Sequence, residues 1–195
     1  MGSSTAFVMP LKSFGNAKGR LATVLGPESR ERLSRECAER VVAAAGALPV
    51  IIVTDADNEV ADWASSRGLT CVTQTSAGLN GAVADGISWA RSNGFNTAII
   101  AHSDIPLATE VSQFIHEGAV VIVPDHANDG TNLLVVPTTA EFNFHYGPGS
   151  FKKHVDEAMQ RGFVPRIALS DEWSRDLDNP DDLTDPRIKE LFPWL

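Results

Sequence analysis

The alternation of short apolar runs with segments of helical period is the sequence feature that most limits how this chain can fold. Apolar runs rich in β-branched residues predict strands at 5–11, 50–54, 69–73, 97–102, 119–124, 132–137 and 164–169. Between and after them, periodicity and boundary residues predict helices at 27–45, 58–67, 79–93, 109–117, 151–161 and 186–191. Continuously apolar strands need cover on both faces. The pattern therefore predicts an α/β fold with a mostly parallel sheet and helices on both faces.

Length and charge limit the class of protein further. A chain of 195 residues predicts a single domain over residues 1–195. A formal net charge of −9 argues against non-specific binding to nucleic acid or to anionic membranes. Cys37 and Cys71 form no CxxC motif, and the longest apolar stretch, 43–53, is too short to span a bilayer. We therefore expect a cytoplasmic protein.

A basic segment follows the first predicted strand. Ligands of parallel α/β sheets bind beyond the carboxyl ends of the strands. Residues 1–27 contain Lys12, Lys18 and Arg20 and no acidic residue. Glycines in the same loop would let backbone amides approach an anion closely. The loop matches neither a Walker P-loop nor GxGxxG, so a solvated loop with ordinary basic residues remains the alternative.

Carboxylates follow other predicted strands. Asp104 comes directly after the strand at 97–102, where it either points into the crevice or caps the next helix. Asp176 and Asp178 form a DxD motif in an extended stretch, so both carboxylates share one face while Leu177 points inward. Two carboxylates beside substrate phosphates suit Mg²⁺. Solvated charge in an acidic tail is the alternative for the DxD motif.

The helix predicted at 151–161 has an unusual first turn. Ser150 precedes it and suits an N-cap. Lys152, Lys153 and His154 follow, although cations at a helix N-terminus oppose its macrodipole. A bound anion would relieve that conflict, because backbone amides and basic side chains would then point at one ligand. The sequence therefore predicts an anion site at this helix start.

Five motifs, taken together, carry a family resemblance. MPLKSFGNAKGRL, AHSDIPL, DGTNLL, HYGPGSFKKH and DLDNPDDL occur in this order along nearly the whole chain. The chain resembles the CofC/FbiD guanylyltransferases of coenzyme F-420 biosynthesis. The resemblance implies a nucleotide-diphospho-sugar-transferase-like (MobA-like) fold. It also implies transfer of GMP from GTP to phosphoenolpyruvate, 2-phospho-L-lactate or 3-phosphoglycerate, with the product passed to a deazaflavin transferase.

The resemblance also implies roles for individual residues. The loop that handles the phosphates of GTP would contain Lys12, Lys18 and Arg20. Lys18 and Asp104 would be catalytic, and Asn80 would lie near the nucleoside. The ligands of Mg²⁺ would be Asp104, Asp176 and Asp178. The acceptor acid would be held by Thr131, Gly147 and Ser150. Ile105 and Asn179 depart from the Leu and Thr that are usual in the family, without affecting the chemistry.

Two other functions compete with this interpretation. One is a MobA-like nucleotidyltransferase with another acceptor, such as a molybdopterin or a sugar phosphate. The other is a nucleotide-binding module without catalysis, which would bind GTP but not turn it over. If the basic loop contacts GTP, replacing Lys18 by Ala should weaken nucleotide binding with little loss of thermal stability.

Overall fold

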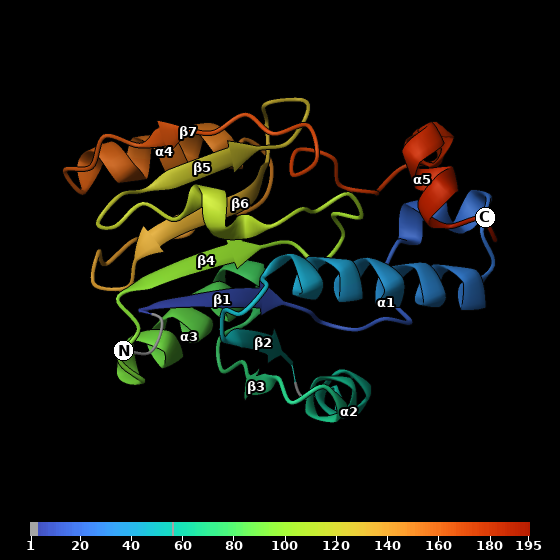
Figure 1. Ribbon diagram of the computed structural model, residues 1–195, viewed down its shortest axis with the longest axis horizontal. Coiled ribbons are helices and arrows are strands. Elements are labelled where there is room, and N and C mark those ends of the chain that lie inside the picture. Colours follow the sequence, from blue (N-terminus) through green and yellow to red (C-terminus); the bar gives the residue numbers. More distant parts are fainter. Residues whose placement is uncertain (1–3, 56) are drawn as a thin grey trace.

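The computed structural model describes residues 4–55 and 57–195, which fold around one mixed sheet (Figure 1). The order of its seven strands is β3-β2-β1-β4-β6-β5-β7. The strands are β1 (Thr5–Pro10), β2 (Val50–Thr54), β3 (Thr70–Thr73), β4 (Thr97–Ala101), β5 (Val121–Pro124), β6 (Thr131–Pro137) and β7 (Arg166–Ile167). The α/β class predicted from the sequence is confirmed.

Helices cover both faces of the sheet. They are α1 (Pro27–Ala44), α2 (Asn58–Ser66), α3 (Gly78–Ser92), α4 (Ser150–Gln160) and α5 (Pro186–Leu191), with 3-10 turns η1 (Gly19–Thr23), η2 (Val111–Phe114) and η3 (Pro180–Thr184). Alternate residues of β1 point to opposite faces, so Phe7 packs in the core under α1 and α2 and Val8 in the core under α3 and α4. Among the described residues, no helix is long and apolar enough to cross a membrane.

The direction of β6 places the start of this strand at the edge of the sheet where the parallel strands β1 and β4 end. β1 runs parallel to β2 and β4, whereas β6 is antiparallel to both β4 and β5. The first residues of β6 therefore lie beside the carboxyl end of β4, where the His102 amide donates to the Asn132 carbonyl over 3.2 Å. The DGTN motif reaches the carboxyl end of β4 through this antiparallel pairing.

Two predicted elements are wrong in extent. In place of a helix at 109–117 the chain forms only η2, because Val111 and Phe114 are its buried residues and their spacing of three suits a single 3-10 turn. The strand expected at 164–169 is reduced to the two residues of β7. Val164 and Leu169 are 90% and 82% exposed, so no buried face holds a longer strand. The remaining predicted elements agree with the structure to within two residues at each end.

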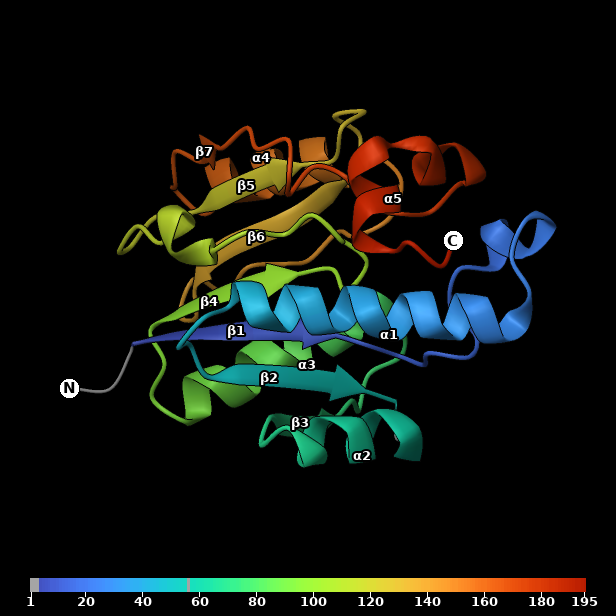
Figure 2. The same cartoon turned by 45° about the vertical axis from the view of Figure 1, so that its right-hand side comes forward.

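The C-terminal segment returns to the carboxyl edge of the sheet. Figure 2 shows α5 beside α1. A separate apolar cluster joins this segment to α1 and η1, and consists of Leu21, Leu33, Cys37, Leu177, Ile188 and Phe192. Leu177 is the central residue of the DxD motif and is buried as predicted. Because Leu177 is held in this cluster, the carboxylates of Asp176 and Asp178 on either side of it lie near the end of β4.

Helix α3 lies very close to the sheet at Gly86. A Cβ atom added at Gly86 would lie 2.6 Å from Cγ1 of Val8 and 2.9 Å from Cγ2 of Val53. Both neighbours are β-branched core residues in adjacent strands, with stiff side chains that cannot easily turn away. The glycine therefore sets the distance between this helix and the sheet.

Replacing Gly86 by Ala should destabilise the protein. Helix propensity alone would favour Ala by about 1 kcal/mol, but overpacking of a close-packed core costs about 1–3 kcal/mol. We expect a net fall in the free energy of unfolding of up to about 2 kcal/mol, measured by urea denaturation. Ser88→Ala, on the exposed side of the same helix, is the control and should not destabilise the fold. A Gly86→Ala protein more stable than the wild type would contradict the tight contact.

Candidate active site

The ammonium group of Lys18 brings three distant segments together. Its Nζ lies 3.1 Å from Oδ2 of Asp104, 2.5 Å from the Leu177 carbonyl and 3.6 Å from Oδ1 of Asp178. The Lys18 side chain is only 3% exposed, and its backbone has a φ of 59°. The Leu177 amide also donates to the Asp104 carbonyl, over 3.0 Å. The loop after β1, the end of β4 and the DxD motif therefore meet at one point.

Lys18 and Asp104 stabilise each other in their charged forms. Burial opposes the charge of Lys18, but the Asp104 carboxylate and the other nearby groups together outweigh this effect, and the pKa of Lys18 is raised. Burial likewise disfavours the Asp104 carboxylate, but the nearby Lys18 ammonium holds the pKa of Asp104 below its ordinary value. The pair is therefore ionised at neutral pH. The sequence left open a solvated loop in which Lys18 would be exposed, whereas the structure buries its side chain.

The DxD carboxylates carry negative charge that Lys18 does not balance. Burial raises the pKa values of Asp176 and Asp178, and the Asp104 carboxylate raises both further. Arg20 approaches Asp178 at 3.5 Å but is mostly exposed. Oδ1 of Asp104 is buried and has no hydrogen-bond partner in the structure. Within residues 4–55 and 57–195, no three His, Cys, Asp or Glu side chains are grouped so that they could hold a metal ion by themselves.

Two adjacent cavities open beside this point. One, of about 210 Å³, is lined by Lys18, Asp104 and Asp178 together with the loop after β1. The other, of about 160 Å³, is lined by Gly78 and other residues at the start of α3. Both include the chain at Pro10, Leu11 and Lys12. Lys12 is 84% exposed, and its ammonium lies 3.4 Å from the Asp55 carboxylate at the rim of these cavities.

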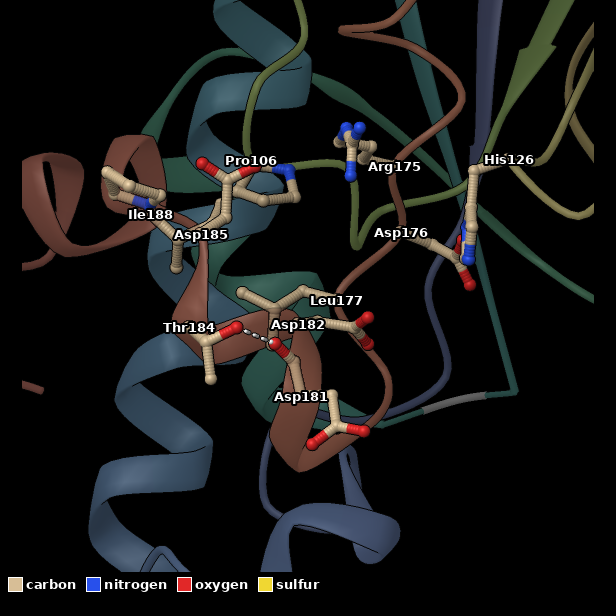
Figure 3. Close-up of a pocket in the computed structure, with 11 residues that line it drawn as sticks. Pro106, His126, Arg175, Asp176, Leu177, Asp181, Asp182, Thr184, Asp185 and Ile188 are labelled. Atoms are coloured by element: carbon tan, nitrogen blue, oxygen red, sulfur yellow. Dashed lines mark hydrogen bonds between the residues drawn. The ribbon is translucent and has the colours of Figure 1, made fainter.

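A larger cavity of about 360 Å³ lies on the other side of the DxD motif (Figure 3). Asp176 and several acidic residues of the tail line it. Oδ2 of Asp182 accepts hydrogen bonds from the amides of Asp178 and Asn179, over 2.8 and 2.6 Å. Asp185 accepts from the Arg187 amide at the start of α5. These two carboxylates hold the backbone around the DxD motif and the tail.

A second polar group forms where β6 and α4 begin. Thr131 is the first residue of β6, Ser150 is the first residue of α4, and both are buried. The DGTN motif holds the glycine loop before α4, because Oδ2 of Asp129 accepts from the Gly149 amide over 3.0 Å. Gly147 and Gly149 have φ values of 118° and 70°, which only glycine adopts readily. Thr131, Gly147 and Ser150 thus belong to two loops held together.

The predicted start of α4 needs correction. Gly149, and not Ser150, is the N-cap, and no side chain caps the helix. Lys152 pairs with Asp156 at 2.5 Å, and Nζ of Lys153 donates to the Pro148 carbonyl over 2.8 Å. His154 is fully buried, and burial lowers its pKa to about 4, so it is neutral. The cationic first turn predicted from the sequence is therefore wrong for His154, and both lysines bind neighbouring acceptors.

Asn80 links this second group to α3. Its Oδ1 accepts from the Tyr146 amide over 2.7 Å, and its Nδ2 donates to the Tyr146 carbonyl over 3.3 Å. The Asn80 amide group is thus used to hold the loop before α4. Gly78 and Leu79, immediately before it, line the smaller cavity. A contact between Asn80 and a nucleoside stays a prediction.

Sequence analysis missed His102 and Tyr146, which lie between the two polar groups. Their rings are 5.3 Å apart, and the Tyr146 ring is 4.8 Å from that of His154. Nε2 of His102 and the Tyr146 hydroxyl are buried without a hydrogen-bond partner in the structure. His102 stands two residues before Asp104 in the AHSD motif. His102 lies in the motif AHSDIPL and Tyr146 in HYGPGSFKKH, and this position was the one sequence signal that could have identified them.

The burial of Lys18 changes the expected effect of removing it. Lys18→Met leaves the Asp104 carboxylate without its partner, and breaking a buried ion pair in this way costs about 3–5 kcal/mol. We expect a loss of that size in the free energy of unfolding, measured by denaturant titration, and partial recovery in Lys18→Met/Asp104→Asn. Lys12→Met, at an exposed lysine of the same loop, should be neutral. Wild-type stability of Lys18→Met would contradict the buried pair.

Comparisons with known proteins show which sequences this chain resembles. The family described as "Guanylyl transferase CofC like" matches residues 5–189. A phosphoenolpyruvate guanylyltransferase from Rubrobacter xylanophilus is 34% identical, and the alignment covers 90% of each chain. A 2-phospho-L-lactate guanylyltransferase from Methanothermobacter thermautotrophicus is 32% identical over 92% of this chain and 82% of its own.

Solved structures show the same fold at low sequence identity. A putative nucleotide-diphospho-sugar transferase from Desulfovibrio desulfuricans superposes with a TM-score of 0.79 at 15% identity, covering 96% of this chain and 90% of its own. The nucleotidyl transferase Mth528 gives a TM-score of 0.69 at 15% identity, covering 97% and 98%. The fold is thus that of the nucleotide-diphospho-sugar transferases, and the match over almost the whole sequence shows that this chain belongs to the CofC-like guanylyl transferase family.

Proposed function

We propose that this protein transfers GMP from GTP to phosphoenolpyruvate or 2-phospho-L-lactate and releases pyrophosphate, in coenzyme F-420 biosynthesis. The observation that carries the proposal is the buried Lys18 ammonium among Asp104, Leu177 and Asp178, at the wall of a cavity. The named activities of the Rubrobacter and Methanothermobacter relatives support the substrates. Transfer of an anionic group needs fixed positive charge where the phosphates lie. The Lys18 ammonium would supply part of this charge, and a bound metal ion would offset the carboxylates of Asp104, Asp176 and Asp178.

GTP would lie across the two adjacent cavities. The triphosphate would occupy the cavity at the loop after β1, where Lys18 is fixed and Lys12 and Arg20 are exposed enough to close on it. The nucleoside would occupy the cavity beside Gly78, close to Asn80. The continuous lining at Pro10–Lys12 supports one extended ligand spanning both.

The residues around Lys18 fit a magnesium ion. Mg²⁺ is usually bound by one or two carboxylates together with substrate phosphates, so a complete protein cage is not required. One or two of the carboxylates of Asp104, Asp176 and Asp178 would hold it together with substrate phosphates. Oδ1 of Asp104, which is buried and has no hydrogen-bond partner among the described residues, is an available oxygen ligand. When bound, Mg²⁺ would supply charge neutralisation at the transferring and leaving phosphates.

The reaction needs little covalent chemistry from the protein. A phosphate oxygen of the acceptor attacks the α-phosphorus of GTP, the bond to the β-phosphate oxygen breaks, and pyrophosphate leaves. Phosphate is already a competent nucleophile at neutral pH, so no general base is required. Lys18 neutralises phosphate charge, while Thr131, Gly147 and Ser150 hold the acceptor in line. Catalysis then rests on positioning and charge.

An assay with separate acceptors tests the proposed function. Purified protein, GTP and Mg²⁺ are supplied in separate reactions with phosphoenolpyruvate, 2-phospho-L-lactate, 3-phosphoglycerate, a sugar phosphate or a molybdopterin, and pyrophosphate release is measured. A deazaflavin transferase with its precursor then traps the product. We expect release only with a phosphorylated acid, and with one of the first two above the third. Binding of GTP without turnover would support the non-catalytic module, and turnover only with a sugar phosphate or a molybdopterin would support a MobA-like enzyme.

The proposed metal ligands predict a specific loss of activity. Asp176→Asn removes one ligand without touching the Lys18 pair, and should lower kcat by about 10²–10³-fold, as loss of one electrostatic contact to a transition state typically does. Asp181→Asn, at an exposed acidic residue of the same tail, should retain activity. Circular dichroism checks that both proteins are folded. Full activity of the wild type in excess EDTA would contradict metal dependence.

Ser150 predicts a selective effect on the acceptor. Because Ser150 does not cap α4, Ser150→Ala should leave the melting temperature nearly unchanged. Loss of a hydrogen bond to a charged group is worth about 1.5–3 kcal/mol, or about ten- to a hundred-fold in affinity. We expect that rise in the KM of the acceptor and little change in the KM of GTP, from steady-state kinetics. An unchanged acceptor KM would remove Ser150 from the acceptor site.

A further inference from the structure

His154 is a buried residue that contacts Thr131, a residue of the proposed acceptor site. It is fully buried at the start of the second turn of α4. Its Nε2 accepts a hydrogen bond from the His145 amide over 3.0 Å. Its Nδ1 lies 3.0 Å from Oγ1 of Thr131. The ring therefore spans from the loop before α4 to the first residue of β6.

These two contacts determine which ring nitrogen carries the hydrogen. A backbone amide can only donate, so Nε2 must be unprotonated. Burial keeps the ring neutral, and a neutral imidazole without a hydrogen on Nε2 carries it on Nδ1. Nδ1–H then donates to Oγ1 of Thr131, and the Thr131 oxygen is the acceptor in that contact.

The orientation of the Thr131 hydroxyl follows. Its oxygen receives a hydrogen bond from His154, so its own hydrogen must point elsewhere. Thr131 is buried, and the described part of the chain offers its hydroxyl no second partner. We propose that His154 is a positioning residue that holds the Thr131 hydroxyl as a hydrogen-bond donor toward an anionic oxygen, phosphate or carboxylate, of the acceptor. The inference rests on the proposed function, because it needs the acceptor beside Thr131.

The loop that contains Asn143 and His145 is also attached to α4 by a contact that does not involve His154. Oε1 of Glu157, one turn further along α4, accepts from the Asn143 amide over 3.0 Å. This bond joins the same loop to the same helix without His154. Replacing His154 by a residue that keeps one of its two contacts therefore leaves the loop attached.

Two substitutions separate the two contacts of His154. The side-chain amide of Asn reaches the position of Nδ1, so it can still donate a hydrogen bond to Thr131. The side-chain amide of Gln reaches the position of Nε2, so it keeps the hydrogen bond from the His145 amide and loses the one to Thr131. In His154→Gln we expect the acceptor KM to rise about tenfold or more, with the KM of GTP unchanged. In His154→Asn we expect the acceptor KM to stay close to that of the wild type. An unchanged acceptor KM in His154→Gln, or an equal rise in both variants, would overturn the proposal.

A double-mutant cycle tests whether His154 acts through Thr131. Thr131→Val removes the hydroxyl and keeps the shape, so it should raise the acceptor KM by itself. Adding His154→Gln to Thr131→Val should then cause no further rise, because the hydroxyl that His154 orients is absent. Additive effects of the two substitutions would overturn the proposal.

The tautomer is measured directly in the wild type, whatever the stability of the variants. In protein labelled with ¹⁵N-histidine, two-bond ¹H–¹⁵N spectra at neutral pH should show His154 protonated at Nδ1 only, and phosphoenolpyruvate should shift this signal in the wild type but not in Thr131→Val. A hydrogen on Nε2, a charged ring or a signal insensitive to phosphoenolpyruvate would overturn the proposal. Failure of the proposed function is distinct, since GTP would then give no turnover with any phosphorylated acid in the wild type.

Discussion

The buried ion pair between Lys18 and Asp104 is the interaction on which the arrangement of the site depends. A charged ammonium out of contact with water requires a charged partner and further acceptors, and Asp104 and the Leu177 carbonyl supply them. These partners are 86 and 159 residues away in sequence. The pair therefore ties the loop after β1 and the C-terminal segment to the end of β4.

The antiparallel direction of β6 explains why the site has two halves. Parallel strands β1 and β4 deliver their following loops to one edge, which forms the half around Lys18. Because β6 runs the other way, its first residue, Thr131, arrives at the same edge and brings the start of α4 with it. The rings of His102, Tyr146 and His154 fill the space between the halves. The polar residues at this edge thus belong to two separately built groups.

Much of the fold was predictable from the sequence because the residues that become buried are apolar and recur at the spacing of a helix or a strand. Strands β1 and β4 are apolar on both faces, which predicts a covered sheet, and α3 shows its buried side at helical spacing. The segment at 109–117 was predicted less well, because two buried residues three apart fit a 3-10 turn as well as a helix. The candidate site residues were identified by motif, and the structure brings Lys18, Asp104 and Asp178 into contact.

The sequence by itself determined the fold class, the acidic overall charge and the places along the chain where polar motifs follow strands, since these properties are local. Only the tertiary structure decided that Lys18 is buried, that Ser150 does not cap α4 and that His154 is neutral. Each of these depends on groups far away in sequence or on the depth of a side chain in the core. Charge state and hydrogen-bond direction are set by such surroundings, and no local pattern of residues records them.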